Sequence, residues 1–556
     1  MSHELFERHR DLLERAVAAT RSREYFAAYD ESPSPRVYGE EAAPLGKAAF
    51  EAVLGTEFPL STPGASGTVA TEKSPFGFAL EVAYPRVTED GVTELLSAAA
   101  AGMKDFRDAG PEGRVGVCIE ILRRLHGRVF ELANAVQHTS GQAFVMAFQA
   151  GGAHALDRAL ESVAYAWTAM TQVPRTAVWE KPARGEPLRM EKTFTVVPRG
   201  VALVIGCNTF PTWNSWPGLF ASLACGNPVV VKPHPGAVLP LAITVQVARE
   251  VLAEAGFDPN LVTLAAEDPA DRLAAVLAVR PEVRLVDFTG SNAFGDWLEE
   301  HARQATVFTE KAGVNTVVVD STDSFRGMCM NLAFSLSLYT GQMCTAPQNV
   351  YLPAAGIETD EGPKSVEEVA AGLDGALQKL LGEDARAVEL LGGVVNEGVL
   401  SRLDAAGARG RVLVESRAVQ HPAFEGAVVR TPTVVGLVAE DAEVYEEECF
   451  GPVSYLIQTS GTDQSIDLFR RTVTEHGAMT ASVYSSSPAV VEAMREAALD
   501  AGVALSENLT GQVFVNQSAA FSDFHGTGAN PAANASYTDL GYVASRFRIV
   551  QSRRHL

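Results

Sequence analysis

The sequence predicts an α/β fold, with a doubly wound parallel sheet, a second α/β region after it, and a hairpin that projects from the body. Between residues 200 and 308, continuous apolar runs alternate with helical stretches, which is typical of parallel strands buried on both faces. The alternation resumes between residues 316 and 515. Residues 178–198 instead alternate around an Arg-Gly-Glu-Pro turn, which predicts a β-hairpin.

The part of the chain before the hairpin is predicted to be mainly helical, apart from one long irregular segment. Apolar residues at helical spacing predict a helix over residues 2–28. Residues 31–85 are rich in Pro, Gly, Ser and Thr, which predicts an extended segment that wraps a surface. Further helices are expected over 92–109, 113–139 and 153–171.

Both α/β regions can be divided into strands and helices from the apolar pattern alone. In the first region, strands are expected at 200–206, 228–233, 261–264, 284–291 and 305–308, with helices at 210–224, 239–255, 269–279 and 293–303. In the second region, a helix is expected at 365–381 and strands at 412–415, 433–438, 453–458 and 480–483.

An alternating strand at 545–551 near the C-terminus matches the hairpin at 178–198 in character. Exposed strands promote aggregation unless their edges pair. We therefore expect these two elements to mediate homo-oligomerisation, as a homodimer or homotetramer.

Composition excludes several function classes. The 556 residues include 45 Lys and Arg against 68 Asp and Glu, a net charge of −23, which argues against non-specific nucleic-acid binding. The six cysteines are scattered and no His cluster accompanies them, so no metal site is predicted. Sparse cysteines suit a reducing cytoplasm, and no signal peptide or membrane-spanning run is recognised, so we expect a cytoplasmic protein.

Four groups of residues could carry chemistry. They are Gly-Cys-Asn-Thr-Phe-Pro-Thr-Trp at 206–213 with Val-Val-Lys-Pro at 230–233; Phe-Thr-Gly-Ser at 288–291 with Gly295; Thr-Glu-Lys-Ala-Gly-Val-Asn at 309–315; and Gly-Gln-Met-Cys at 341–344 with Glu-Glu-Cys-Phe-Gly-Pro-Val at 447–453. Cys344 follows an apolar helical run and precedes a strand. A thiol at such a junction can be an activated nucleophile, although the local sequence alone favours a small buried hydrophobe.

In this order, the four groups resemble the aldehyde dehydrogenase superfamily. Its pattern is Pro-x-Asn-Phe-Pro, a Lys-Pro strand end, Phe-Thr-Gly-Ser, Glu-Leu-Gly-Gly, Gly-Gln-x-Cys and Glu-x-Phe-Gly-Pro. The likeness runs from about residue 87 to the C-terminus. The N-terminal segment and the Phe-His-Gly-Thr-Gly sequence at 524–528 resemble most the phenylacetic acid degradation (PaaN) branch of that superfamily.

The resemblance implies an aldehyde dehydrogenase-like fold and a division into parts. These are an N-terminal helix and wrapping segment (1–86), a cofactor-binding domain that carries the oligomerisation hairpin (87–315), a catalytic domain (316–520), and a C-terminal loop with an oligomerisation strand (521–556).

The resemblance also implies catalytic roles. Cys344 would attack the aldehyde, and Glu310 would activate the water that hydrolyses the resulting thioacyl-enzyme. Asn208 would supply the amide that stabilises the oxyanion, although Thr209 stands where the family has its Asn before Phe, so either residue can serve. Lys311-Ala312-Gly313 also departs from the family's Leu-Gly-Gly after the glutamate.

For the cofactor, the resemblance implies that Lys232 binds the adenine ribose and that Ser291 caps the helix under the pyrophosphate. Glu448 would hold the nicotinamide ribose, with Phe450 nearby, and Gly290 and Gly295 would complete the turn and helix. NAD-preferring members commonly carry a Glu three residues after the Lys. Here Pro235 stands in that place, which favours NADP over NAD.

The function implied is NAD(P)-dependent oxidation of an aldehyde, with a CoA-linked semialdehyde of phenylacetate catabolism as the substrate suggested by the PaaN likeness. A CoA-acylating aldehyde dehydrogenase and a non-catalytic scaffold of the same fold are the alternatives. Six side chains either line the substrate pocket or pack in the core: Trp213, Trp216, Phe220, Tyr339, Phe524 and His525.

Overall fold

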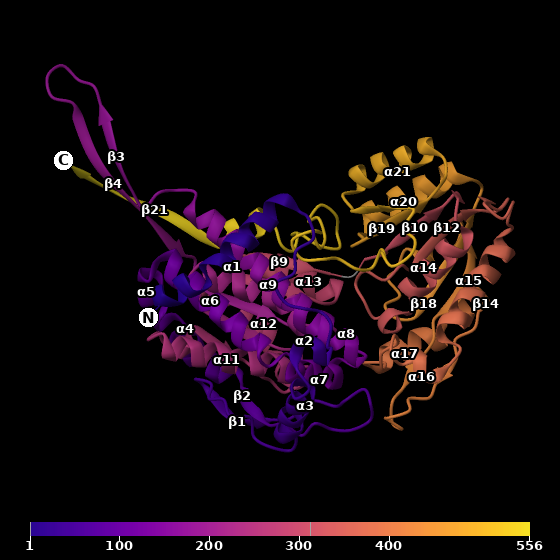
Figure 1. Ribbon diagram of the computed structural model, residues 1–556, viewed down its shortest axis with the longest axis horizontal. Coiled ribbons are helices and arrows are strands. Elements are labelled where there is room, and N and C mark those ends of the chain that lie inside the picture. Colours follow the sequence, from indigo (N-terminus) through magenta and orange to yellow (C-terminus); the bar gives the residue numbers. More distant parts are fainter. Residues whose placement is uncertain (1, 312) are drawn as a thin grey trace.

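Two α/β units lie side by side, and a narrow three-stranded arm extends away from the first unit (Figure 1). The computed structural model describes residues 2–311 and 313–556. Most of the N-terminal half of the chain builds the first unit, and the segment between β10 and β20 builds the second.

The first unit is a five-stranded parallel sheet in the order β7-β6-β5-β8-β9, as the continuous apolar strands predict. Its strands are β5 (Val201–Ile205), β6 (Val229–Lys232), β7 (Val262–Leu264), β8 (Val283–Thr289) and β9 (Thr306–Glu310). The connecting helices are α10 (Pro211–Ala224), α11 (Leu239–Glu254), α12 (Leu273–Ala278) and α13 (Asn292–His301).

The second unit is a seven-stranded sheet in the order β14-β17-β18-β12-β10-β19-β20. All neighbours are parallel except β14 and β17. The strands are β10 (Thr316–Val319), β12 (Asn349–Pro353), β14 (Arg411–Val414), β17 (Thr433–Val438), β18 (Val453–Thr459), β19 (Ala481–Tyr484) and β20 (Leu505–Glu507). Its helices include α14 (Phe325–Ser337), α15 (Val366–Leu381), α16 (Asp384–Ala387), α17 (Glu397–Asp404), α18 (Ala406–Arg409), α19 (Ala442–Tyr445), α20 (Thr462–His476) and α21 (Pro488–Ala501).

Helices from the N-terminal part of the chain cover the first sheet. They are α1 (Ser2–Ser22), α4 (Val92–Ala101), α5 (Met103–Asp108), α6 (Gly110–His126), α7 (Val129–Ser140), α8 (Phe144–Phe148) and α9 (His154–Thr171). Buried side chains of α1, α6, α9, α10 and α11 belong to one hydrophobic core. Apart from boundaries, short breaks and helix α8, which was not predicted, these helices agree with the sequence prediction.

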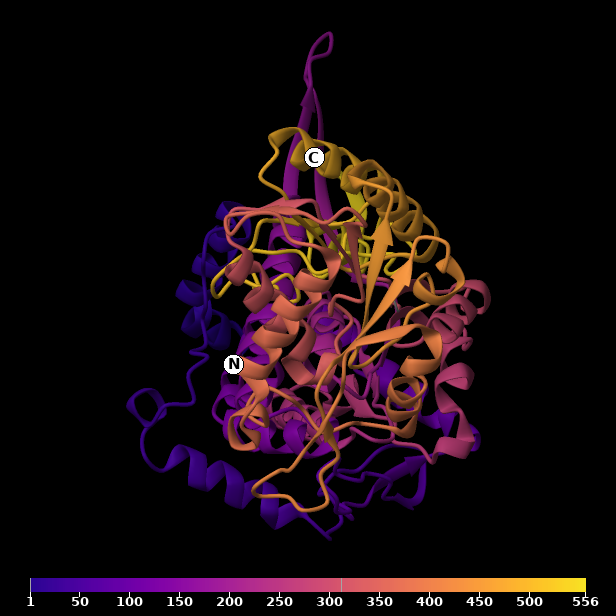
Figure 2. The ribbon, with the colours of Figure 1, turned by 90° about the vertical axis from the view of Figure 1, so that its right-hand side faces the viewer.

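The segment at 31–85 does run along the outside of the molecule (Figure 2), but the prediction that it is only extended is wrong. It contains α2 (Pro35–Tyr38), α3 (Ala42–Val53), β1 (Ala65–Val69) and the start of β2 (Tyr84–Val87). Pro44 lies in the first turn of α3, where its missing N–H costs no helical hydrogen bond. Gly46 allows close approach, since a β-carbon there would overlap Phe130 on α7.

The arm is formed by β3 (Thr176–Lys181), β4 (Leu188–Pro198) and β21 (Phe547–His555), all antiparallel. The hairpin and the C-terminal strand therefore pair with each other within one chain. A short helix, α22 (Leu540–Ala544), leads into β21. Among the described residues, no helix is long and apolar enough to cross a membrane.

Candidate active site

Cys344 follows a turn whose backbone conformation is unfavourable for two of its three residues. After α14, Tyr339, Thr340 and Gly341 all have positive φ, at 54°, 56° and 64°. This region is unfavourable for a β-branched residue such as Thr340. The side chains compensate, since Tyr339 donates to the carbonyl of Ser140 and Thr340 donates to that of Gly392 at 2.8 Å.

The residues after the turn are held equally firmly. The side-chain amide of Asn315 donates to the carbonyl of Cys344 at 2.7 Å, and its oxygen accepts from the backbone N–H of Met479 at 2.9 Å. The hydroxyl of Thr345 donates to the carbonyl of Asn516 at 2.8 Å. The chain at the half-buried residue Cys344 is therefore hydrogen-bonded to the residue before β10, and through it to the segment before β19. Thr345 adds a hydrogen bond to the loop after β20.

Glu310 ends β9 and faces the thiol from the first unit. One carboxylate oxygen accepts from the amide of Asn214 at 2.8 Å, and the other lies 3.1 Å from Nε2 of His525. Burial opposes ionisation of Glu310. When His525 is protonated, its charge and hydrogen bond, helped by hydrogen bonds from Cys344 and Asn214, outweigh burial and hold the pKa of Glu310 below its ordinary value.

Burial raises the pKa of the Cys344 thiol well above its ordinary value, and the neighbouring Glu310 carboxylate raises it further. The resting site therefore pairs a neutral thiol with an ionised carboxylate. Because only the thiolate is strongly nucleophilic, attack on a substrate requires a group that takes the thiol proton.

His525 comes from the C-terminal loop, 181 residues after Cys344, and its Nε2 lies 3.8 Å from the Cys344 sulfur. Its ring packs edge-to-face on Trp213, with centroids 4.5 Å apart. The sequence suggested both residues only as pocket or core side chains. In contrast, Trp216, Phe220 and Tyr339 are fully buried packing residues.

The ligand atoms of Glu310, Cys344 and His525 all lie within 4.8 Å of one another. The sequence prediction that no metal site exists did not foresee this cluster, because His525 is remote in the chain. A half-buried thiol beside a buried carboxylate and a buried imidazole can also serve nucleophilic attack and proton transfer.

The side-chain amide that donates to Glu310 belongs to Asn214, and that of Asn208 is directed elsewhere. The amide of Asn208 donates to the carbonyl of Thr139 at 3.0 Å, and its oxygen leaves no room for a β-carbon on Gly236. The alternative, Thr209, has its hydroxyl 4.0 Å from the sulfur of Cys207. Asn214, one turn into α10, is a functional candidate that the motif did not indicate.

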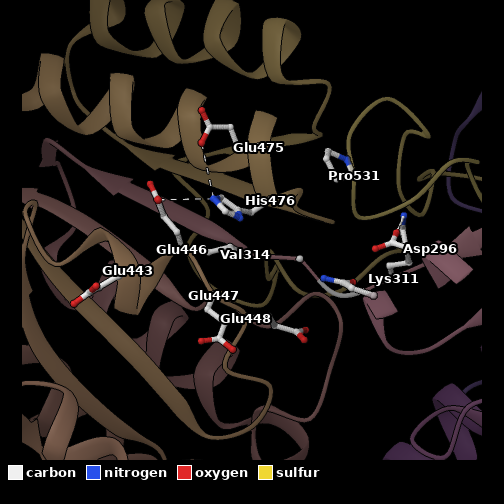
Figure 3. Close-up of a pocket in the computed structure, with 12 residues that line it drawn as sticks. Asp296, Lys311, Val314, Glu443, Glu446, Glu447, Glu448, Glu475, His476 and Pro531 are labelled. Carbon is white, nitrogen blue, oxygen red and sulfur yellow. Dashed lines mark hydrogen bonds and ion pairs between the residues drawn. The ribbon is translucent and has the colours of Figure 1, made fainter. Parts of the chain in front are cut away.

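A cleft of about 470 Å³ opens between the two units, and its lining includes Lys311, the residue that follows Glu310. Lys311 and Asp296 line it from the first unit, and a row of glutamates that includes Glu448 faces them from the second (Figure 3). Lys311 forms an ion pair with Asp296 at 2.7 Å. His476 lies between Glu446 and Glu475 at the far wall (Figure 3).

The predicted cofactor residues of the first unit lie at the carboxyl edge of its sheet. Lys232 ends β6, and Gly290 and Ser291 lie between β8 and α13, with Ser291 in the N-cap position but making no side-chain cap hydrogen bond. Gly295, within α13, allows the Lys311 side chain to pass, since a β-carbon there would lie 2.5 Å from it.

Lys232 is buried and forms an ion pair with Glu267, which follows β7. Glu267 also accepts from the backbone N–H of Leu273 at 2.5 Å, which fixes its orientation. A carboxylate therefore does lie beside Lys232, although it comes from a neighbouring strand and not from the position of Pro235.

Glu448 and Phe450 lie on the loop that precedes β18, and Glu448 lines the cleft. Burial raises the pKa of Glu448 to about 7, against the lowering effects of Arg402 and of a hydrogen bond from the backbone of Gly313. The carbonyl of Phe450 accepts from the guanidinium of Arg402 at 2.8 Å. Arg402 thus orders this side of the cleft.

Comparison with known proteins gives three findings. Residues 65–529 match a family model described as the aldehyde dehydrogenase family. The crystal structure of an NAD-dependent aldehyde dehydrogenase from Burkholderia multivorans is 57% identical, with a TM-score of 0.98 and complete coverage of both chains. A 1-pyrroline-5-carboxylate dehydrogenase from Bacillus subtilis is 23% identical over 504 residues, which covers 86% of this chain and 90% of that protein.

Proposed function

This chain belongs to the aldehyde dehydrogenase family and is an oxidoreductase, and from that premise we propose that it oxidises an aldehyde to the free carboxylic acid. The observation that carries the proposal is the contact between the Cys344 thiol of the second unit and the Glu310 carboxylate of the first. A nucleophile and a base brought together from two units suit a two-step acyl transfer.

The two residues divide the work. Cys344 attacks the carbonyl carbon to form a thiohemiacetal, and loss of hydride leaves a thioester on the sulfur. Glu310 then removes a proton from the water that hydrolyses this thioester. The lowered pKa of Glu310 keeps the carboxylate ionised and able to accept that proton.

The residues along the cleft fit a nicotinamide dinucleotide, which when bound would accept the hydride. The N-terminus of α13 offers backbone N–H groups to a pyrophosphate. Lys232 with Glu267 would bind the adenine ribose, and Glu448 would accept hydrogen bonds from the nicotinamide ribose. Each ribose would therefore find a carboxylate for its hydroxyls.

For the choice of cofactor we propose NAD rather than the NADP that Pro235 favoured. The Glu267 carboxylate beside Lys232 would repel a ribose 2′-phosphate and accept from a 2′-hydroxyl. The similar protein from Burkholderia multivorans is named NAD-dependent. A Glu267→Gln variant should therefore gain relative activity with NADP.

For the substrate, we propose a semialdehyde that carries a CoA thioester, in a cytoplasmic enzyme. The support is the resemblance of the N-terminal segment and of residues 524–528 to the PaaN branch. A CoA-acylating reaction is less favoured because Glu310 is placed to activate water. A non-catalytic scaffold is less favoured because it would not need the strained turn before Cys344.

The test is reduction of NAD and of NADP by the wild-type enzyme, Cys344→Ala and Glu310→Gln. The aldehyde panel would include a CoA-linked semialdehyde, with 1-pyrroline-5-carboxylate for comparison. Cys344→Ala should be inactive. Glu310→Gln should release one equivalent of reduced cofactor per active site and then turn over roughly 10²–10⁴-fold more slowly, because the thioester accumulates.

Two outcomes would contradict the proposal. Undiminished cofactor reduction by Cys344→Ala would reject the thiol as nucleophile. Transfer of labelled CoA into the product would show thiolysis instead of hydrolysis.

A further inference from the structure

We infer that His525 is a catalytic residue of this site, which takes the Cys344 proton when the thiol attacks and returns it when the acyl group leaves. The inference rests on the proposed function. Its basis is geometric, because Nε2 of His525 lies within reach of both reacting partners, 3.8 Å from the sulfur of Cys344 and 3.1 Å from the carboxylate of Glu310.

The proton balance needs such a group. The thiol proton moves to Nε2 as the sulfur bonds to the carbonyl carbon, and the imidazolium then faces the Glu310 carboxylate, which stabilises it. During hydrolysis Glu310 takes a proton from water. The sulfur leaves as the C–S bond breaks and recovers its proton from Nε2, and the proton on Glu310 passes to solvent.

Glu310 alone would have to serve both steps. If it took the thiol proton, it would have to lose that proton to solvent before it could activate water. With His525 present, one group handles the sulfur proton and the other handles the water proton. The imidazole is suited to the first role because histidine exchanges protons near neutral pH.

The loop that carries His525 is fixed as a catalytic residue requires. Its backbone exchanges two hydrogen bonds with Tyr537, of 2.7 and 2.9 Å. The buried guanidinium of Arg158 donates to the carbonyl of Asp523 at 2.9 Å and to Glu161 at 2.7 Å. The chain on both sides of His525 is thus anchored, and the ring is supported by Trp213.

Charged and titratable groups from several elements surround Cys344 and His525, and they bear on how the alkylation rate of Cys344 depends on pH. Glu310 on β9 faces both partners. The charges that act on the thiol besides Glu310 are Cys207 before α10 and Glu448 before β18. Arg158 on α9 lies over the neighbouring ring of Trp213, at 5.6 Å. The wild type and a neutral His525 variant share all of these groups.

The test is the rate at which iodoacetamide alkylates Cys344 between pH 5.5 and 9.5, followed by intact mass, with Cys344→Ser identifying the signal. His525→Gln, which retains size and polarity but exchanges no proton, should react at least ~10-fold more slowly than wild type at pH 7, and the pH profile of its alkylation should differ from that of wild type. His3→Gln, an exposed histidine on α1, is the matched control and should follow wild type.

Equal rates and equal profiles for wild type and His525→Gln would overturn the inference, even if aldehydes are oxidised. Alkylation that depends on His525 would support it, even if no tested aldehyde is a substrate, in which case only the proposed function fails. Should His525→Gln not fold, the wild-type profile decides alone, since a single inflection above pH ~9 would exclude an imidazole partner.

Discussion

Glu448 is the residue whose ionisation should be visible in cofactor binding. Burial places its pKa at about 7, so the side chain changes charge within the working range of most enzymes. In an unfolded chain the same carboxyl would ionise near its ordinary pKa of ~4.3. Between pH ~4.3 and about 7 the carboxyl therefore ionises more readily in the unfolded chain than in the folded protein. The free energy of unfolding falls as the pH rises through this range, so the buried carboxyl costs stability.

Under the proposed function, we predict that affinity for NAD falls as pH decreases through 7, because protonated Glu448 accepts ribose hydrogen bonds poorly. Glu448→Gln should bind roughly 10-fold or more weakly at pH 8, since hydrogen bonds to a charged group contribute ~1.5–3 kcal/mol. Its affinity should be nearly independent of pH between 6 and 8. Isothermal titration calorimetry with NAD measures both effects.

Glu443 provides the matched control, because it lines the same cleft but is not buried. Glu443→Gln should keep the wild-type pH dependence. A wild-type affinity that does not change across this range would show that Glu448 does not hold the ribose through its charge.

At the scale of elements, the turn between α14 and β12 positions Cys344. Gly341 has φ +64°, and a β-carbon there would lie 2.6 Å from the carbonyl oxygen of Gly451. We predict that Gly341→Ala lowers the free energy of unfolding by about 1–3 kcal/mol, from backbone strain and overlap together. The same displacement should alter the alkylation rate of Cys344, which follows three residues later.

Chemical denaturation measures the change in stability, and Gly375→Ala is the control. Gly375 lies within α15, and a β-carbon added there would meet no atom within 4 Å. Alanine at that position should raise the free energy of unfolding by up to ~1 kcal/mol. If both variants are stabilised, the turn does not impose the constraint described here.

The predictable parts of the fold are those with a local pattern. Buried parallel strands and their helices follow from continuous apolar runs, and the resemblance assigns Cys344 and Glu310 because each lies in a contiguous motif. His525 and Glu267 escape such reasoning, because each reaches its partner from a distant segment. Helix α3 was missed because Pro44 and Gly46 resemble helix breakers, although one suits a first turn and the other a close helix contact.

At the scale of the molecule, the C-terminal segment runs through the loop that carries His525, contacts the first unit and ends in the arm. Arg546 forms a buried two-point ion pair with Asp287 on β8, at 2.6 and 2.8 Å, and the arm strand β21 starts at the next residue. The same segment carries His525 upstream. The ion pair therefore fastens the start of the arm strand to the first unit, and removing either partner would leave an uncompensated buried charge.

The arm itself has no partner along its outer edges among the residues that the structure describes. In the order β21-β4-β3, both β3 and β21 are edge strands, and apolar side chains on them are exposed: Val178, Trp179, Ile549 and Val550. Unpaired edges with apolar side chains favour association with another copy. We therefore predict that Val550→Asp lowers the assembly mass in sedimentation equilibrium relative to wild type, with no loss of unfolding cooperativity, because Val550 contributes nothing to the core.

Val279→Asp, an exposed apolar position after α12, should leave the mass unchanged. A monomeric wild type would contradict the prediction, and the exposed arm would then need another explanation.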